Sequence, residues 1–213
     1  MKIIQISRRL SNWEVGNSRG HECLVNLPIN LKGLLFNNQK DIYFTDKRQK
    51  DQLFLLTYFS NRDWVKKPGQ YYNKYHLQGG DEIVLERRIY DDGKEEYFID
   101  FLKNENIVFQ KKSFYDEEKD QRVIGFERLK GDLDSFNEKY GDYISIIPMG
   151  NFLRQRPIRE DAEKYYYECF DIKKDGESIL NKYSNNDMVE IKVYNDKPDV
   201  NFVNSVVICQ MEV

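Results

Sequence analysis

Apolar and polar residues alternate in residues 3–10 (IIQISRRL), and this period of two is typical of a strand that buries one face. Further strands are predicted at residues 23–28 (CLVNLP), 41–48 (DIYFTDKR) and 51–60 (DQLFLLTYFS). Gln49-Lys50 separates the last two stretches and predicts a hairpin there. Residues 29–36 (INLKGLLF) instead have leucines at helical spacing, which predicts one or two helical turns.

The stretch from residue 51 to residue 88 organises this half of the chain. An apolar strand over residues 53–59 is followed by a polar break at Ser60, Asn61 and Arg62, and then by a tryptophan segment and a short tyrosine-rich helix. The turn at residues 77–81 (LQGGD) leads into a second strand, because its two glycines supply the positive-φ positions that a tight turn needs.

The second half predicts a mixture of strands and helices. Strands are expected at residues 97–102, 107–109, 123–127 and 143–148, helices at 132–140 and 159–170, and an exposed charged loop at 110–121. Residues 188–194 and 206–213 are expected to close the fold as an antiparallel pair. The fold class is therefore mainly β (α+β), with one domain over residues 1–109 and a smaller mixed α/β portion over residues 110–213.

Composition agrees with a sheet-based fold. Aromatic residues make up 14% of the 213 residues, and Ala162 is the only alanine. Three widely separated cysteines, without C-x-x-C spacing, indicate neither a zinc ribbon nor a disulfide framework. The richness in Lys, Asn, Ile and Tyr suggests an AT-rich bacterial genome. No apolar run approaches the ~20 residues of a membrane span and no signal peptide is evident, so we expect a cytoplasmic protein without a membrane partner.

Charge is distributed unevenly along the chain. Residues 1–75 contain 13 Lys and Arg and 6 Asp and Glu, a balance of +7, whereas residues 76–213 contain 20 and 30, a balance of −10. Such asymmetry is typical of a protein that binds a polyanion with one part of its surface. A nucleic acid is therefore a candidate partner despite the overall charge of −3.

The order of strand, polar break, Trp64, helix, Leu-x-x-Gly-Asp turn and strand resembles the B3-like pseudobarrel DNA-binding domains. These domains occur in plant transcription factors and in the recognition domains of some prokaryotic restriction enzymes, such as the EcoRII-type endonucleases. The run Gly20-His21, Pro28 and Leu34-Leu35-Phe36 is similar to the corresponding strand and helix of the EcoRII-type domain. The resemblance covers residues 2–102 and departs from the plant pattern in the spacing of the tryptophan segment.

The resemblance implies two arms that clamp the major groove of double-stranded DNA. By position, the first arm is residues 11–19 and the second arm is residues 58–67. The candidate arm residues are Asn12, Trp13, Asn17, Ser18 and Arg19 in the first arm and Ser60, Asn61, Arg62 and Asp63 in the second. Independently of the resemblance, Arg, Asn and Asp are side chains that read guanine, adenine and cytosine. Candidate phosphate contacts are Arg8, Arg9, Lys47, Arg48, Lys66 and Lys67.

The sequence thus predicts a sequence-specific recognition module for double-stranded DNA in a restriction-modification system. The chain has no Gly-rich phosphate loop, and two histidines, His21 and His76, cannot form a multi-histidine metal site. We assign no catalytic residue, expect no cofactor and no bound metal, and expect other subunits or domains of a restriction complex as partners. By analogy, LlaJI-like systems of the McrBC type would supply that context.

Two alternatives stay open at this point. A Mg²⁺-dependent nuclease of the PD-(D/E)xK kind would use Glu190 and Lys192, with Asp171 or Asp175 as the further carboxylate. The same Glu-x-Lys triplet also fits an ordinary half-buried strand. A third hypothesis is a module that binds a protein or a small ligand through the acidic second half.

Overall fold

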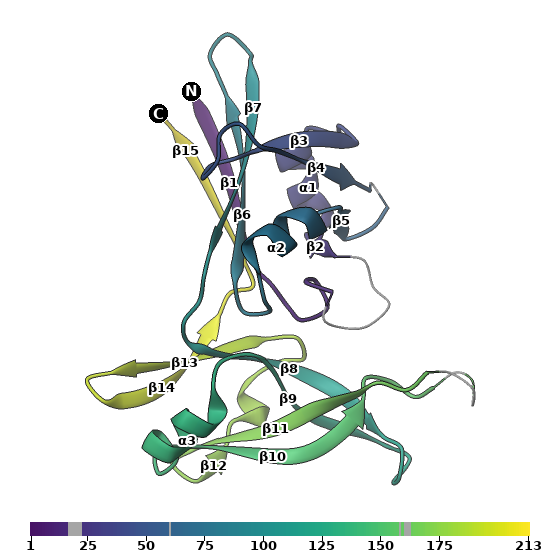
Figure 1. Ribbon diagram of the computed structural model, residues 1–213, viewed down its shortest axis with the longest axis vertical. Helices are drawn as coiled ribbons and strands as arrows, with labels where there is room; N and C mark the ends of the chain where they lie inside the picture. The colour runs from purple at the N-terminus through teal and green to yellow at the C-terminus, as the bar shows by residue number, and fades with distance from the viewer. Residues whose placement is uncertain (17–22, 60, 158, 160–162) are drawn as a thin grey trace. The chain divides into compact units, whose positions relative to one another are not determined.

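The computed structural model describes residues 1–16, 23–59, 61–157, 159 and 163–213, and the chain divides into two compact units (Figure 1). Unit 1 is Met1–Asn104 together with Ser205–Val213, and unit 2 is Glu105–Asn204. Strands dominate both units, so the mainly β class is confirmed at that level. The chain leaves unit 1 after Asn104 rather than after residue 109, and its last residues return to unit 1.

Unit 1 is built on one sheet, in which eight strands are described. Its elements are β1 (Lys2–Arg9), β2 (Leu24–Asn26), α1 (Ile29–Phe36), β3 (Asp41–Asp46), β4 (Leu53–Tyr58), β5 (Trp64–Lys66), α2 (Gly69–Tyr75), β6 (Glu82–Ile89), β7 (Glu95–Leu102) and β15 (Val206–Glu212). The strand order is β15-β1-β6-β7-β3-β4-β5-β2, and the β3–β7 pair is parallel whereas the other pairs are antiparallel. The first strand, the β3–β4 hairpin, both helices and the strand after the glycine turn were all predicted from the sequence.

The core of unit 1 follows from the alternation of its strands. Ile4 and Ile6 of β1 are buried on one face of the sheet, where Ile6 packs with Leu35 of α1 and Tyr71 of α2 in one apolar cluster. Full burial of a large apolar side chain contributes about 1.5–3 kcal/mol relative to its exposure. The helices therefore hold their places on the sheet through their apolar faces.

The predicted glycine turn holds the base of the first arm. Gly80 has φ +88° and donates its backbone N–H to Leu10 O at 2.7 Å, while Leu10 N donates to Asp81 O at 2.8 Å. Gly79 is needed for a different reason, since a Cβ there would lie 2.4 Å from Asn12 Oδ1. The absence of a side chain at Gly79 thus lets the first arm lie directly against the turn.

Unit 2 is a second β unit rather than a mixed α/β portion. Its elements are β8 (Ile107–Asp116), β9 (Gln121–Lys130), α3 (Leu133–Tyr140), β10 (Ile144–Leu153), β11 (Tyr166–Lys174), β12 (Glu177–Ser178), the 3₁₀ turn η1 (Leu180–Lys182), β13 (Met188–Tyr194) and β14 (Lys197–Val203). The strand order is β10-β11-β9-β8-β13-β14, with β12 paired to β11. Asp132 caps α3 as predicted, because its side chain accepts hydrogen bonds from the backbone N–H groups of Asp134 and Ser135.

Three expectations for the second half were wrong. The charged stretch at residues 110–121 is strand β8 and its turn into β9, not an exposed loop. The expected helix at 159–170 is replaced at its end by β11, which pairs with β10 along its length. The last strand, β15, pairs with β1 and not with residues 188–194, whose neighbours are β8 and β14.

Candidate nucleic-acid interface

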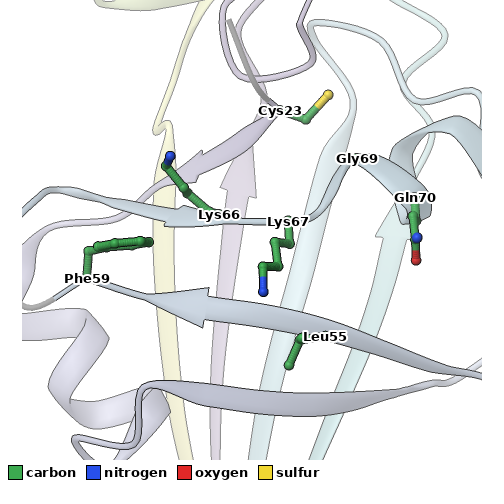
Figure 2. A pocket seen from close by; sticks show the side chains of 7 residues that line it. All are labelled: Cys23, Leu55, Phe59, Lys66, Lys67, Gly69 and Gln70. Atoms are coloured by element: carbon green, nitrogen blue, oxygen red, sulfur yellow. The ribbon is translucent and has the colours of Figure 1, made fainter.

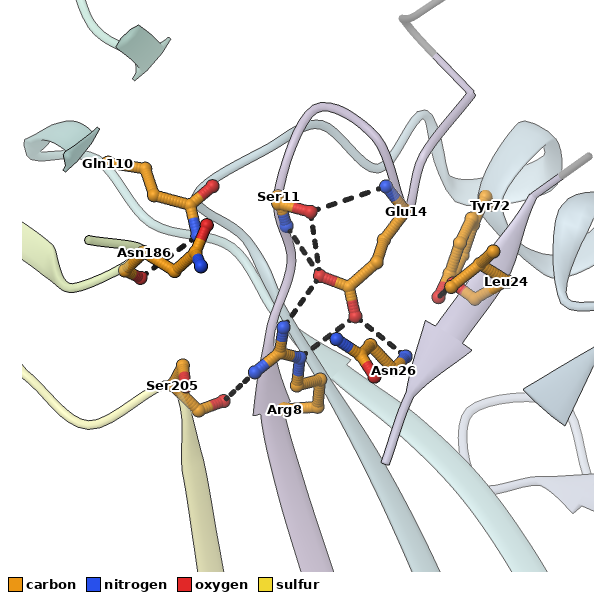
Figure 3. Close-up of polar contacts among 9 residues, drawn as sticks. All are labelled: Arg8, Ser11, Glu14, Leu24, Asn26, Tyr72, Gln110, Asn186 and Ser205. Carbon is orange, nitrogen blue, oxygen red and sulfur yellow. Dashed lines mark hydrogen bonds and ion pairs between the residues drawn. The ribbon is translucent and has the colours of Figure 1, made fainter. Parts of the chain in front are cut away.

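A buried ion pair fixes the base of the first arm (Figure 3). Arg8 Nε donates to Glu14 Oε1 at 2.8 Å, and a second guanidinium nitrogen donates to Oε2 at 3.0 Å. The Glu14 side chain is 0% exposed and that of Arg8 is 9% exposed. The same carboxylate accepts hydrogen bonds from Ser11 N, Ser11 Oγ and Asn26 N, so all its lone pairs are used.

This geometry removes Arg8 from the expected DNA contacts. Its guanidinium also donates to Ser205 O at 3.4 Å, which ties β1 to the segment before β15. A buried guanidinium in a bidentate carboxylate pair cannot turn outward without leaving a buried charge uncompensated. Arg8 is therefore a structural anchor of the first arm.

Three other expected phosphate contacts are also held within unit 1. Arg9 pairs with Glu82 at 3.6 Å, Lys47 with Glu86 at 2.5 Å and Arg48 with Asp100 at 2.8 Å. The Arg48 guanidinium in addition lies 3.8 Å from the ring centroid of Phe101. Carboxylates of β6 and β7 thus neutralise these cations. These carboxylates lie beyond residue 75, so in the folded unit they offset part of the surplus positive charge of residues 1–75. Unit 1 as a whole has 17 Lys and Arg against 15 Asp and Glu, and unit 2 has 16 against 21.

The two arms meet through their tryptophans. The rings of Trp13 and Trp64 lie with centroids 5.8 Å apart and planes tilted by 50°, a distance that is typical of a favourable aromatic pair. The Arg62 guanidinium lies 5.4 Å from the Trp64 ring. Glu14 is linked to the same tryptophan pair. Its side chain accepts a hydrogen bond from the backbone N–H of Asn26 in β2, and Asn26 pairs with Trp64 of β5.

The polar triplet of the second arm is presented outward. Asn61, Arg62 and Asp63 are all exposed, while Trp64 beside them is half-buried. The backbone under the triplet is held at Asp63, whose carbonyl accepts a hydrogen bond from Leu27 N at 2.9 Å. Three side chains with the donors and acceptors for base edges thus project from a braced segment.

A buried lysine that the sequence analysis missed supports the same arm from below. Lys32 of α1 is 0% exposed and its Nζ donates to Phe59 O at 2.8 Å, with Nζ 5.1 Å from the Tyr58 ring. Burial lowers the pKa of Lys32, and the charge of Asp63 opposes that shift. In sequence Lys32 reads as an ordinary polar position of a short helix, so nothing marked it as a support of the second arm.

Glu14 could have been found from its spacing. Ser11-x-x-Glu14 has the pattern in which a serine and a glutamate exchange hydrogen bonds with each other's backbone N–H. That exchange is present, since Glu14 N donates to Ser11 Oγ at 3.3 Å and Ser11 N donates to Glu14 Oε2 at 2.9 Å.

Among the remaining candidate DNA contacts, Asn12 and Lys66 are half-buried and Lys67 is exposed. Asn17, Ser18, Arg19 and Ser60 lie outside the described residues.

The nuclease alternative finds Glu190 and Lys192 paired on β13, but Asp171 on another strand of the sheet. Glu190 Oε1 accepts from Asn106 at 3.0 Å, and Lys192 Nζ pairs with Glu190 Oε2 at 3.0 Å on β13. Asp171 is on β11, and β9 and β8 lie between β11 and β13 in the sheet. Within the described part of the chain, no group of three or more His, Cys, Asp or Glu residues has the geometry to hold a metal ion.

Comparison with known proteins assigns no family. No family model matches the chain, and no curated protein matches it either.

The helices in the described ranges include none that is long and apolar enough to cross a membrane.

Proposed function

We propose that unit 1 is a B3-like pseudobarrel that recognises a specific site in double-stranded DNA through the major groove. The single observation that carries the proposal is the braced second arm, in which exposed Asn61, Arg62 and Asp63 stand beside a tryptophan pair that joins both arms. Sequence-specific readout needs polar groups held at fixed positions, because each bidentate contact depends on geometry. The order of elements around the arms supports the pseudobarrel.

In this proposal the polar and charged residues of unit 1 have different tasks. Arg62 and Asn61 contact base edges, and Lys66 and Lys67 contact phosphates close to them. Arg8, buried against Glu14, holds the first arm without touching DNA, whereas Arg9, Lys47 and Arg48 are paired with carboxylates of β6 and β7 that reduce the positive charge they offer. We further infer that the chain acts as the recognition part of a larger restriction enzyme or complex, an inference that rests on analogy.

A selection experiment tests the proposal directly. The full chain is incubated with a pool of randomised duplexes at two salt concentrations without Mg²⁺, and the retained fraction is sequenced. We expect enrichment of one short motif and retention that falls steeply with salt, because released counterions drive phosphate binding. Retention without any enriched motif, or no retention at low salt, contradicts specific recognition.

A further inference from the structure

A pocket of about 730 Å³ opens beside the second arm (Figure 2). Its lining includes Leu55 of β4, Phe59, Lys66 and Lys67 at the end of β5, and Gln70 at the start of α2. The volume lies within the ~300–1,000 Å³ typical of sites for small ligands. All of these residues belong to unit 1, and Phe59 and Lys66 flank the exposed triplet at residues 61–63 along the chain.

The floor of the pocket is apolar, with one aromatic ring. Leu55 is half-buried in β4 between the core residues Phe54 and Leu56, so it lies on the strand face away from that core, and Phe59 directly follows the end of β4. The backbone of Phe59 is fixed from below by the hydrogen bond from Lys32 Nζ at 2.8 Å. The backbone that carries this half-buried ring is therefore fixed, and the ring offers a stacking surface for a flat ligand.

Two lysines, the amide of Gln70, Cys23 and Gly69 form the rest of the lining. Lys66 Nζ lies 5.6 Å from the centroid of the Phe59 ring. Lys67 has φ +72° and directly precedes Pro68, a combination that is disfavoured both for a side chain other than glycine and for the residue before a proline. The surrounding fold maintains this strained conformation, and Figure 2 shows the Lys67 side chain extending toward β4.

We propose that this pocket takes one nucleotide turned out of the DNA duplex, with its base stacked on Phe59. Gln70 offers an amide to the edge of the base, and Lys66 and Lys67 offer positive charge to its phosphates. A flat apolar surface next to two ammonium groups matches a base joined to phosphate better than it matches a purely apolar ligand or a small inorganic anion. The inference rests on the proposed DNA recognition and adds a nucleotide site that Phe59, Lys66 and Lys67 of the second arm form together with Leu55 and Gln70.

The test uses duplexes that carry the motif enriched in the selection, with 2-aminopurine placed at each position in turn. We expect the full chain to increase the fluorescence at one position, because an unstacked 2-aminopurine is less quenched. Phe59→Ala should remove that increase and weaken binding about tenfold, given the usual effect of losing one base–aromatic stack. Gln70→Ala, an exposed position that should leave the fold intact, should alter base preference at that position alone.

Leu53→Ala is the matched control, because Leu53 is an exposed apolar residue of the same strand outside the pocket lining. It should leave affinity and fluorescence unchanged. An enriched motif without a fluorescence increase at any position, or wild-type behaviour of both Phe59→Ala and Gln70→Ala, overturns the extruded nucleotide but leaves recognition by the arms. Binding of free deoxynucleoside monophosphates that depends on Phe59, without any signal in duplexes, assigns the pocket to a free nucleotide and also overturns the proposal. If no motif is enriched, the proposed function itself fails.

Discussion

Residues of one type have different tasks in this protein according to where the fold places them. Arg8 and Arg62 were both candidate DNA contacts, Arg8 for phosphate and Arg62 for bases, yet Arg8 is buried against Glu14 and Arg62 is exposed beside Trp64. Sequence reasoning grouped them because charge is a property of the residue, whereas burial is a property of its surroundings. Substitution of Arg8 should therefore mainly lower the free energy of unfolding, whereas substitution of Arg62 should mainly weaken DNA binding.

Arg62→Ala should weaken binding to the selected DNA site by about 1–3 kcal/mol and relax specificity at one base pair. The free energy of unfolding should change little, because the side chain is exposed. Binding titrations against the selected site and against single-base variants of it check both parts. Unchanged affinity and specificity would show that the second arm does not read bases.

Lys67→Ala should weaken binding to every sequence alike, since a phosphate contact carries no base information. The slope of log affinity against log salt should become shallower by about one unit. Titrations at several salt concentrations on the selected and on an unrelated duplex measure this effect. A loss confined to one sequence would instead place Lys67 against a base edge.

Glu14→Ala should lower the free energy of unfolding by about 3–5 kcal/mol, because the Arg8 guanidinium is left buried without its partner. Urea unfolding of unit 1 measures the change, with Asp51→Ala at an exposed turn position as the control. A loss near that of the control would mean that Arg8 finds solvent when Glu14 is removed, and the anchor assigned to the first arm would be wrong.

At the scale of elements, helix α2 is tied to the β3–β4 hairpin through Asp46. The Asp46 carboxylate is fully buried and accepts hydrogen bonds from Arg48 N at 2.9 Å, from Lys74 Nζ at 3.1 Å and from the Tyr75 hydroxyl. Burial acts to raise the pKa of Asp46, but the hydrogen bonds from Tyr75, Arg48 and Lys74 outweigh it, so the pKa is lowered. The charged form of Asp46 is therefore stabilised in the folded state.

The lowered pKa of Asp46 gives a stability that depends on pH. Its contribution is present above the pKa of an unfolded aspartate, about 3.9, and is lost as the pH falls through the lower folded value. Asp46→Asn should cost about 1–3 kcal/mol at pH 7. The difference from wild type should shrink below about pH 4, as measured by urea unfolding between pH 3 and 7. Asp51→Asn on the same hairpin should show neither effect.

The elements that the sequence missed share a physical cause. Residues 110–116 of strand β8 were read as a loop because they are polar, yet Lys111 is buried and donates at 2.6 Å to both Leu180 O and Tyr183 O. Those acceptors are far away in sequence, so no local pattern could reveal them. Strand β11 was read as part of a helix, and its tyrosines favour a strand once β10 is there to pair with it.

At the scale of the whole molecule, unit 1 is completed by the last strand of the chain. β15 pairs with β1 from Lys2↔Glu212 to Arg8↔Val206, and Val206 packs against the core of unit 1. Unit 2 is inserted between β7 and β15 and has an apolar core of its own around Phe109, Phe126 and Phe170. The insertion explains why a boundary drawn once along the sequence could not describe the fold.

Truncation after Asn204 should lower the stability of unit 1 and leave unit 2 unchanged. Cross-strand pairs contribute roughly 0.2–1 kcal/mol each, so the loss of β15 should amount to a few kcal/mol. Urea unfolding followed by tryptophan fluorescence reports unit 1 alone, because both tryptophans, Trp13 and Trp64, belong to it. Removal of Val213 alone is the control. Equal stability of the truncated and full chains would show that β15 adds nothing to unit 1.

The sequence by itself determined the local elements and turns of the first hundred residues, and the start of helix α3 in the second half. Alternation, the Gly79-Gly80 turn and the Asp132 cap act between neighbours in the chain, so their signals are readable there. Only the tertiary structure decided that Arg8 is an anchor, that Trp13 meets Trp64 and that β15 belongs with β1. Each of these depends on pairing between residues that are distant in sequence, where burial sets the cost of a charge and the strand partner sets the register.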